Sequence, residues 1–376
     1  MSESQPIGLG LVGCGAFGQF CLEAFREMPD VRVVAVADVA EDLARAVSRR
    51  FGVAGYTDIA TLLSVRDVSV VHVATPPSTH HDIVMQAIEA GKNVLCEKPL
   101  ATEIADAAGM VGAAAAAGVI TPVNFVLRHN AVTDRVRAVL DSGALGDVLA
   151  AWLVNCAADS NLPAGHWFWD RKVSGGIFIE HGVHFFDLYR HWLGPGELVD
   201  ARTHTRPGTD QQDRVECVVR HGEAVVHHYH GFDQVGPMDR TRHRILCELG
   251  DIRVFGWIPL TVTIDAALDD AGFDALRVAC PDAAVESDEA FTPAQGEVSG
   301  RGKPRRLTRR VRLTCTPDAD KQAVYKRSVQ ALLADQIAAI RDPDHPRRVT
   351  DADGLAAVEM AAAARDLVQS ANPQSG

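Results

Sequence analysis

Ionisable side chains gather in a short apolar stretch from Gly175 to Asp187, which reads GGIFIEHGVHFFD. Glu180 and His184 are four residues apart, so a helix over this stretch places both side chains on one face. An imidazole titrates near neutral pH, which suits it to move a proton to or from a reacting group. Either this face is solvated, or it lines a site where proton transfer takes place.

A glycine-rich turn near the start of the chain is a candidate phosphate site. Gly13, Gly15 and Gly18 form the pattern G-x-G-x-x-G, which follows an apolar run and opens a helical pattern. The first glycine permits a tight turn, the second lets a pyrophosphate approach the backbone, and the third lets the helix pack close to the sheet. The N–H groups at the helix start, including those of Ala16 and Phe17, face the phosphates. A glycine-rich turn without a ligand is the alternative.

An acidic residue completes this dinucleotide pattern. Asp38 ends the next apolar run, at the expected interval of about 20 residues beyond Gly18. Its carboxylate can accept hydrogen bonds from ribose hydroxyls, and its charge opposes a 2′-phosphate, so NAD is favoured over NADP. Arg45, Arg49 and Arg50 fall on the following helical pattern and keep NADP possible.

Two further apolar runs end in polar residues. Thr75 and Pro76 follow one of them, and Glu97 and Lys98 follow the next. Ligands of open parallel sheets bind beyond the carboxyl ends of the strands, so these residues fall where a cofactor lies. The residues alone leave open whether Glu97 and Lys98 form a surface ion pair.

The elements that position these residues alternate along the first third of the chain. Alternating apolar runs and helical patterns predict an α/β fold, a doubly wound parallel Rossmann sheet covered by helices on both faces. The expected strands cover residues 7–13, 31–38, 68–76, 92–99 and 119–125. The expected helices cover residues 16–28, 42–51, 80–90 and 104–117.

The pattern changes after residue 128. Long strand-like segments separated by turns predict an α+β domain with a large, open, mostly antiparallel sheet. Residues 266–320 are rich in Asp, Ala, Gly and Pro, which favours long loops with room for one strand pair. Two helices are expected over 318–340 and 351–371, and the tail 372–376 is expected to be disordered. The predicted domains are 1–127 for the dinucleotide, 128–345 for substrate binding and oligomerisation, and 346–376, a helix and tail that pack back near the first domain.

Composition excludes several classes of protein. The 376 residues carry a net charge of −12, which disfavours nucleic acid as a partner. The basic run from Arg301 to Arg312 is either a solvated loop that leads into a strand or an anion-binding patch. The eight cysteines contain no C-x-x-C pair, so buried free thiols are expected rather than disulfides or zinc ligands. No membrane-length apolar run and no signal peptide are found, which predicts a cytoplasmic protein.

The order of these motifs is that of a known family. The glycine pattern, then ATPPSTH, AGKNVLCEKPLA and GG-x-x-x-E-x-G-x-H-x-x-D, resembles the glucose–fructose oxidoreductase / inositol dehydrogenase (Gfo/Idh/MocA) family from about residue 7 to about residue 200. The resemblance implies a Rossmann domain followed by a domain whose open sheet covers the active site and often mediates oligomers. A homo-dimer or homo-tetramer is therefore expected.

The resemblance also implies roles for individual residues. Lys98 lies near the nicotinamide and hydrogen-bonds the reacting hydroxyl, with a cis bond between Lys98 and Pro99. His184 is the general acid/base, Glu180 assists it or binds an adjacent hydroxyl, and Glu97 and His80 sit by the cofactor.

This chain departs from the family pattern at two positions. Glu180 stands where the family usually has Asp, and Leu127 precedes Arg128 where two arginines are common. Arg128 either binds substrate or closes a helix start. Both departures concern the substrate more than the class of reaction.

Further residues are candidates for substrate contact. Trp167 and Trp169 can stack on a sugar ring or pack as an aromatic loop on the sheet, and Asn155 is a weaker candidate. His228 and His230 share one face of a predicted strand but lack the partners of a metal site, so no metal is predicted.

The predicted function is an NAD(P)-dependent dehydrogenase that acts on a secondary hydroxyl of a sugar, cyclitol or related polyol. Histidine takes the hydroxyl proton, lysine stabilises the developing alkoxide, and the nicotinamide takes the hydride. The sequence also allows two alternative functions. One is an enzyme that retains NAD and cleaves glycosides by oxidation and elimination, and the other is a non-catalytic nucleotide sensor.

Overall fold

The computed structural model describes residues 5–316 and 319–371, and the predicted disorder of 372–376 lies outside them. The chain forms two compact units. The first contains the residues up to 126 together with 164–187 and 325–365, and the second contains 127–163, 188–324 and the residues from 366 on. Each unit is assembled from separate stretches of the chain. The consecutive domains 1–127, 128–345 and 346–376 stay a prediction.

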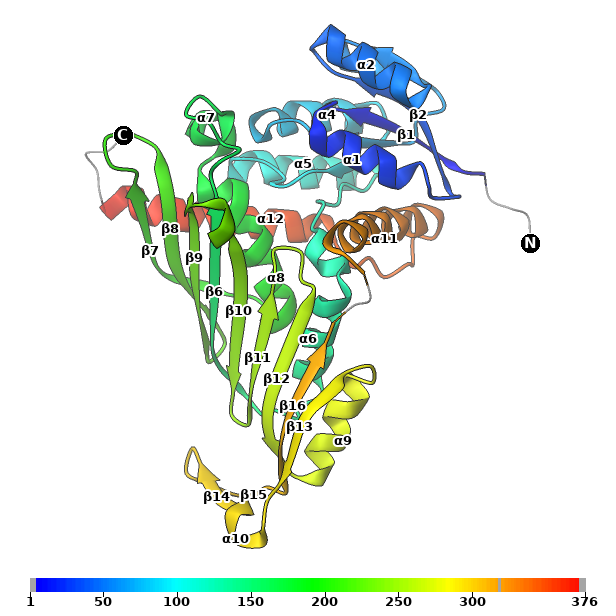
Figure 1. The fold of residues 1–376 in the computed structure, drawn as a ribbon. Coiled ribbons are helices and arrows are strands. Elements are labelled where there is room, and N and C mark those ends of the chain that lie inside the picture. The colour runs from blue at the N-terminus through cyan, green and yellow to red at the C-terminus, as the bar shows by residue number, and fades with distance from the viewer. Residues whose placement is uncertain (1–4, 317–318, 372–376) are drawn as a thin grey trace. The chain divides into compact units, whose positions relative to one another are not determined.

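The first unit contains a five-stranded parallel sheet in the order β3-β2-β1-β4-β5. Figure 1 labels two of these strands, β1 and β2, in blue. The predicted Rossmann fold is therefore confirmed. Its strands are β1 (Ile7–Val12), β2 (Val31–Ala37), β3 (Ala54–Tyr56), β4 (Val70–Val73) and β5 (Asn93–Cys96). The helices that lie wholly in this unit are α1 (Ala16–Phe25), α2 (Glu41–Phe51), α3 (Ile59–Leu63), α4 (His80–Glu89), α5 (Ile104–Ala117) and α7 (Arg171–Ser174), with the short turns η1 (Pro77–Thr79), η3 (Trp167–Trp169) and η4 (Phe178–Gly182).

The strands of this sheet are apolar because helices cover both of its faces. Leu9, Leu11 and Leu95 are fully buried. Each such side chain stabilises the fold by about 1.5–3 kcal/mol relative to an exposed one. The rigid core holds the carboxyl ends of β1, β4 and β5 in a fixed arrangement, and the candidate site residues follow these ends.

One expected strand is wrong. Residues 119–125 form only an isolated bridge, between Cys96 and Val123. Backbone hydrogen bonds do connect this segment to β5, but Pro122 has no N–H to donate, so a regular ladder does not form. The three residues of β3 were not predicted, because so short a strand gives no alternation to detect.

The second unit contains a nine-stranded sheet in the order β13-β16-β12-β11-β10-β6-β9-β8-β7. All neighbours are antiparallel except β6 and β9, which confirms the mostly antiparallel sheet. Its strands are β6 (Val148–Ala158), β7 (Glu197–Thr205), β8 (Gln212–His221), β9 (Ala224–Gln234), β10 (Arg240–Cys247), β11 (Gly250–Phe255), β12 (Thr261–Leu268), β13 (Ala284–Ala290) and β16 (Arg309–Cys315). The remaining elements are η2 (Val126–His129), α6 (Ala131–Asp141), η5 (Gly236–Met238), α9 (Asp270–Ala279), α10 (Pro293–Gly296) and the hairpin strands β14 (Glu297–Gly300) and β15 (Lys303–Arg306). Three α-helices contribute residues to both units, α8 (Val183–Leu193), α11 (Lys321–Arg341) and α12 (Asp351–Ala371).

Residues 266–320 contain more regular structure than their composition predicts. Asp269 caps α9 by accepting a hydrogen bond from the N–H of Gly272 at 2.7 Å, so a residue that reads as part of a loop starts a helix. The basic run does lead into a strand, as expected. Two of its arginines have acidic partners, because Arg301 and Arg305 share Glu248 at 3.0 and 2.7 Å and Arg301 also pairs with Asp147 at 3.4 Å.

No helix among residues 5–316 and 319–371 is long and apolar enough to cross a membrane.

The buried face of the nine-stranded sheet contains neutral histidines. His228 and His243 are each 2% exposed, and the hydroxyl of Tyr189 lies 3.3 Å from Nδ1 of His243. Burial lowers the pKa of His243 to about 3, and burial also holds the pKa of His228 well below its ordinary value. These imidazoles are therefore packed as uncharged rings.

We predict that acid destabilises the fold through His243. The unfolded imidazole takes up a proton below about pH 6.5, whereas the folded one stays neutral down to about pH 3. The stability that depends on the neutral ring is complete above about pH 6.5 and is lost as the pH falls towards 3, by about 1.4 kcal/mol per pH unit. Urea unfolding between about pH 7 and about pH 5 measures this slope. The variant His243→Gln should lose that part of the pH dependence, and an identical slope in both proteins would contradict the prediction.

Candidate active site

A lysine at the end of β5 contacts a glutamate from the apolar segment 175–187. The Nζ of Lys98 donates to the main-chain carbonyl of Glu180 at 2.9 Å and also pairs with its carboxylate. The side chains of Lys98 and Glu180 are 18% and 11% exposed. Lys98 is therefore paired with Glu180 in a mostly buried place, and not with Glu97 at the surface, which was the alternative that the sequence left open. The Lys98–Pro99 peptide bond is cis, as predicted.

The segment that carries Glu180 and His184 is not one regular helix. Residues 178–182 form a π turn, and the α-helix α8 begins only at Val183. A π turn places successive residues differently from an α-helix and is common at functional sites. Glu180 and His184 are 9% and 5% exposed, so neither lies on a solvated face.

His181 was not predicted as a site residue, but it lies close to both His184 and Lys98. Its ring centroid lies 6.0 Å from that of His184, and burial and the charge of Lys98 lower the pKa of His181 to about 3. The residue is therefore neutral and close enough to Lys98 to sense its charge. The spacing of an α-helix predicts that Glu180 and His184 share a face and gives no reason to include His181. His181 lies in the π turn and is a neighbour of His184.

Glu97 is held by buried side chains from two other segments. Its Oε1 accepts hydrogen bonds from Asn124 at 2.6 Å and from Nε2 of His72 at 2.9 Å. A ligand atom of Cys21 lies within 4.8 Å of both His72 and Glu97, so the structure contains a buried Cys–His–Glu cluster that the sequence did not predict. The signal that was available was His72 itself, a lone polar residue in an apolar strand.

His80 connects the loops that follow β4 and β5. It is fully buried, and its Nδ1 and Nε2 lie 2.7 Å from the carbonyl of Pro99 and 2.9 Å from that of Thr75. Burial lowers the pKa of His80, and a neutral imidazole donates through one nitrogen only. The ring thus couples the segment after Lys98 to the loop of Thr75 and Pro76, and direct contact of His80 with a cofactor stays a prediction.

The glycine turn fits a dinucleotide. Gly13 has φ of 99°, and a Cβ there would lie 2.3 Å from the carbonyl oxygen of Ala74. A Cβ on Gly18 would lie 2.3 Å from the carbonyl oxygen of Gly13. A Cβ on Gly15 would meet nothing within 4 Å, and no side chain caps the start of α1 there. The open space over Gly15 and the uncapped helix start can accommodate a pyrophosphate.

Asp38 is fixed beside this turn. Its Oδ2 accepts from the N–H of Cys14 at 2.8 Å, and its Oδ1 accepts from the N–H of Ala40 at 2.9 Å. Both oxygens keep lone pairs for ribose hydroxyls. Two of the three nearby arginines have acidic partners, because Arg45 pairs with Glu41 at 2.8 Å and Arg50 pairs with Glu23.

The predicted substrate residues fall in both units. Trp167 and Trp169 are half-buried in η3 of the first unit, on either side of the buried Phe168. Arg128 and Asn155 are buried in the second unit, where Asn155 accepts a hydrogen bond from Thr241 at 2.8 Å. Their contact with a substrate stays a prediction.

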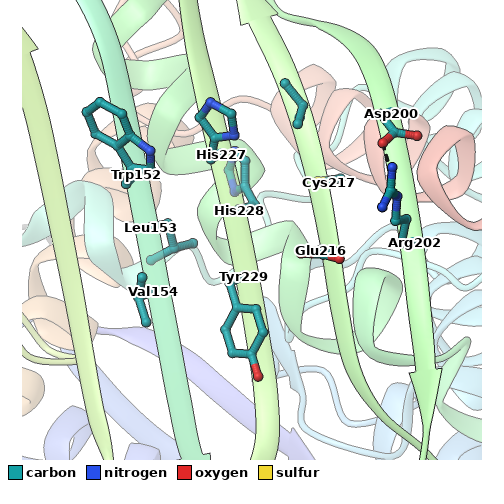
Figure 2. A pocket seen from close by; sticks show the side chains of 11 residues that line it. Trp152, Leu153, Val154, Asp200, Arg202, Glu216, Cys217, His227, His228 and Tyr229 are labelled. Atoms are coloured by element: carbon teal, nitrogen blue, oxygen red, sulfur yellow. Dashed lines mark ion pairs between the residues drawn. The ribbon is translucent and has the colours of Figure 1, made fainter.

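A shallow pocket of about 290 Å³ lies on the nine-stranded sheet (Figure 2). The rings of Trp152 and His227 are stacked in it, with centroids 5.9 Å apart, and Asp200 pairs with Arg202 at 3.3 Å. None of the predicted catalytic or cofactor residues lines this pocket. It is a feature of the sheet surface and not of the candidate active site.

Two family models match the chain. One is described as an oxidoreductase family with an NAD-binding Rossmann fold and matches residues 7–125. The other is described as the GFO/IDH/MocA C-terminal domain and matches residues 133–253.

Individual relatives agree with these matches. A dTDP-3,4-didehydro-2,6-dideoxy-alpha-D-glucose 3-reductase from Saccharopolyspora spinosa is 30% identical over 235 residues, which cover 60% of this chain and 70% of that protein. A levoglucosan dehydrogenase from Pseudarthrobacter phenanthrenivorans is 30% identical over 211 residues, 52% of this chain and 54% of that protein, so only about half of its length is matched. A solved structure of levoglucosan dehydrogenase in complex with NADH and L-sorbose has a TM-score of 0.77 over 98% of both chains at 20% identity, which shows a shared fold.

We predict that Asp38 sets the choice between the two nicotinamide cofactors. Asp38→Asn keeps an oxygen for the N–H of Cys14 but removes the charge that opposes a 2′-phosphate. The ratio of NADPH to NADH affinity should rise by roughly tenfold, measured by nicotinamide fluorescence titration. Asp67→Asn, at an exposed acid that pairs with Arg32, is the control and should leave the ratio unchanged. An unchanged ratio in Asp38→Asn would show that this carboxylate does not face the ribose.

Proposed function

The chain belongs to the Gfo/Idh/MocA family of oxidoreductases, and on that premise we propose that it transfers a hydride between a nicotinamide cofactor and a secondary hydroxyl carbon of a sugar, cyclitol or related polyol. The contact between Lys98 and Glu180 supports this proposal most directly. It joins the end of β5, at the same edge of the parallel sheet as the dinucleotide turn after β1, to the segment that carries His184. A cation and an imidazole in one partly buried site are the two groups that alcohol oxidation requires.

The proposed roles follow from the chemistry of each side chain. The bound nicotinamide supplies the hydride acceptor or donor. His184 takes the hydroxyl proton during oxidation and returns it during reduction. The ammonium of Lys98 stabilises the negative charge that develops on the oxygen, more strongly here than in bulk water because the site is mostly shielded from solvent.

Glu180, which stands where the family usually has aspartate, contacts Lys98 through two groups. Its carboxylate and its main-chain carbonyl both accept from Lys98, so the ammonium is held in place before substrate arrives. The family's usual aspartate is one methylene shorter and would reach less far. We infer that the longer side chain at 180 orients Lys98, which makes Glu180 a positioning residue.

Cofactor and substrate residues complete the proposal. Gly13, Gly15, Ala16, Phe17 and Gly18 form the pyrophosphate cradle. Asp38 binds the ribose, and NAD is preferred because Arg45 and Arg50 are already paired with acidic residues. Thr75, Pro76, Glu97 and His80 shape the nicotinamide end, and Trp167, Trp169, Arg128 and Asn155 contact the polyol.

We further propose a cytoplasmic homo-dimer or homo-tetramer that forms through the nine-stranded sheet. Val154 is 37% exposed in the pocket that Trp152 and His227 line, and Val199 is 56% exposed on β7. Covering these apolar side chains would favour association of two copies. Sedimentation velocity reports the oligomeric state.

A screen of polyols with NAD and NADP tests the proposed reaction. Net reduction of the nicotinamide, seen in its absorbance, identifies a dehydrogenase. Bound NAD that co-purifies and shows no net reduction while a glycoside is cleaved would instead identify the oxidation–elimination reaction. Nucleotide binding with no reaction on any polyol or glycoside would favour the sensor.

Lys98→Met and His184→Ala should each lower kcat by roughly 10²–10⁴-fold while NAD affinity stays nearly constant. The reason is that these groups act on the hydroxyl and its proton and not on the dinucleotide. Lys303→Met is the control, because this lysine is exposed on the hairpin strand β15, which carries none of the proposed site residues. Steady-state kinetics and NADH titration give the two readouts. Full turnover in either site variant would overturn the assigned roles.

We predict that Glu180 acts through Lys98. Glu180→Gln should lower kcat by roughly tenfold in the wild-type background and change the residual rate of Lys98→Met by less than about threefold. The double-mutant cycle therefore shows strong coupling. Additive losses would mean that Glu180 acts on the substrate independently of Lys98.

A further inference from the structure

Three side chains that can bind a metal meet in the core of the first unit. Cys21 lies on α1, His72 lies on β4, and Glu97 directly follows β5. The sulfur of Cys21, a ring nitrogen of His72 and a carboxylate oxygen of Glu97 all lie within 4.8 Å of one another. Cys21 and His72 are fully buried, and Glu97 is 8% exposed. Glu97 is therefore the member of the cluster that solvent can reach.

The hydrogen bonds of this cluster leave two polar atoms unused. Nε2 of His72 lies 2.9 Å from Oε1 of Glu97, and Nδ2 of Asn124 donates to the same oxygen at 2.6 Å. Within the described residues, Nδ1 of His72 and Oδ1 of Asn124 are buried and have no hydrogen-bond partner. A buried polar atom without a partner costs stability, so side chains that only pack are rarely left in this state.

The charges of the cluster also suit a divalent cation. Burial and the charge of Glu97 hold the pKa of Cys21 well above its ordinary value, so this thiol keeps its proton at neutral pH. A cation that displaces this proton would bring two positive charges to two negative ligands, the thiolate of Cys21 and the carboxylate of Glu97. The resulting complex is neutral, which is the form that a protein core accommodates at the least cost.

The types of ligand select the metal. Thiolate and imidazole are ligands of Zn²⁺, whereas Mg²⁺ and Ca²⁺ prefer sites built from oxygen. Ligand atoms around a tetrahedral Zn²⁺ lie about 3.3–3.7 Å apart. The 2.9 Å contact of His72 with Glu97 would open slightly, and the separations of up to 4.8 Å would shorten, through small rotations of the side chains. A half-turn of the Asn124 amide would present Oδ1 as a fourth ligand.

We propose that Cys21, His72 and Glu97 bind a structural Zn²⁺ ion, with the amide oxygen of Asn124 as the fourth ligand. Cys21 releases its proton as the Zn–S bond forms, and no group changes its oxidation state. The ion would hold α1, which begins at the glycine turn, against β4 and the end of β5. The ligands come from separate elements without a short spacing, so the sequence contains no metal motif.

The inference does not depend on the proposed hydride transfer, since no step of that reaction uses this ion. Glu97 is the residue that both proposals share. The experiments below detect bound metal and not turnover, so failure of one proposal is distinguishable from failure of the other.

Cobalt substitution in the full-length protein tests the proposal, because Co²⁺ replaces Zn²⁺ in thiolate sites and is coloured. The protein is produced in zinc-depleted medium with Co²⁺, so that the ion is present while the chain folds around the buried cluster. One Co²⁺ per chain should give the visible bands of a tetrahedral ion and a thiolate-to-cobalt charge-transfer band, and Zn²⁺ should abolish both. Absence of the charge-transfer band would overturn the proposal, whether or not Co²⁺ binds elsewhere.

Variants locate the thiolate. Cys21→Ser should lose the charge-transfer band and bind Co²⁺ at least roughly tenfold more weakly. Cys247→Ser is the matched control, at a buried thiol of the second unit, and should keep the band. A band that persists in Cys21→Ser would overturn the assignment. Where Cys21→Ser folds poorly, anomalous X-ray scattering from wild-type crystals grown with Zn²⁺ decides, and a peak bonded to residues other than Cys21 and His72 would contradict the site.

The pH dependence of binding gives an independent readout. The affinity for Co²⁺ should rise roughly tenfold from about pH 7 to about pH 8, because the proton of Cys21 must leave. A surface site of histidine and carboxylate would show no such rise, since free imidazole has already lost its proton above about pH 6.5. A flat profile in this range would show that the thiol is not a ligand.

Discussion

The ion pair between Lys98 and Glu180 is the constraint on which the candidate active site depends. It connects two segments 82 residues apart in sequence, and it does so through both the carboxylate and the main-chain carbonyl of Glu180. Both side chains are mostly withdrawn from water, so each charge relies on the other for compensation. Loss of one partner leaves a charge poorly solvated, at a cost of about 1–3 kcal/mol. The same contact holds the ammonium of Lys98 against the segment that carries His184.

Buried hydrogen bonds on both sides of Lys98 connect its segment to the neighbouring strand and loops of the first unit. Glu97 is held by His72 and Asn124, and His80 connects the carbonyl of Pro99 to that of Thr75. These contacts join the loops that follow β4 and β5, whereas Nδ1 of His72 and Oδ1 of Asn124 are buried without a hydrogen-bond partner among the described residues. The local geometry is rigid where a hydride transfer site requires it to be, because reacting atoms must approach each other closely and in one orientation.

The sequence predicted the elements whose signals are local. The helix over 104–117 has the predicted bounds, and the glycine turn, Asp38 and the strand-end lysine lie where their spacing indicated. Other features depend on contacts between distant residues. The π turn at 178–182 is not visible as a period in the residues, and the contacts of Glu97 with His72 and Asn124 join three separate segments. The helix α9 was missed because its Asp and Gly residues are as common in loops as at a helix start. The sequence alone therefore did not identify Asp269 as the N-cap.

A crystal structure of the protein with NAD and a polyol that reacts slowly tests the central claim most directly. We expect one secondary hydroxyl to lie within hydrogen-bond distance of both Nζ of Lys98 and the imidazole of His184. The carbon that bears it should face the nicotinamide ring, and the pyrophosphate should lie over Gly15. A hydroxyl bound away from Lys98, or a dinucleotide held elsewhere than at the first glycine turn, would contradict it.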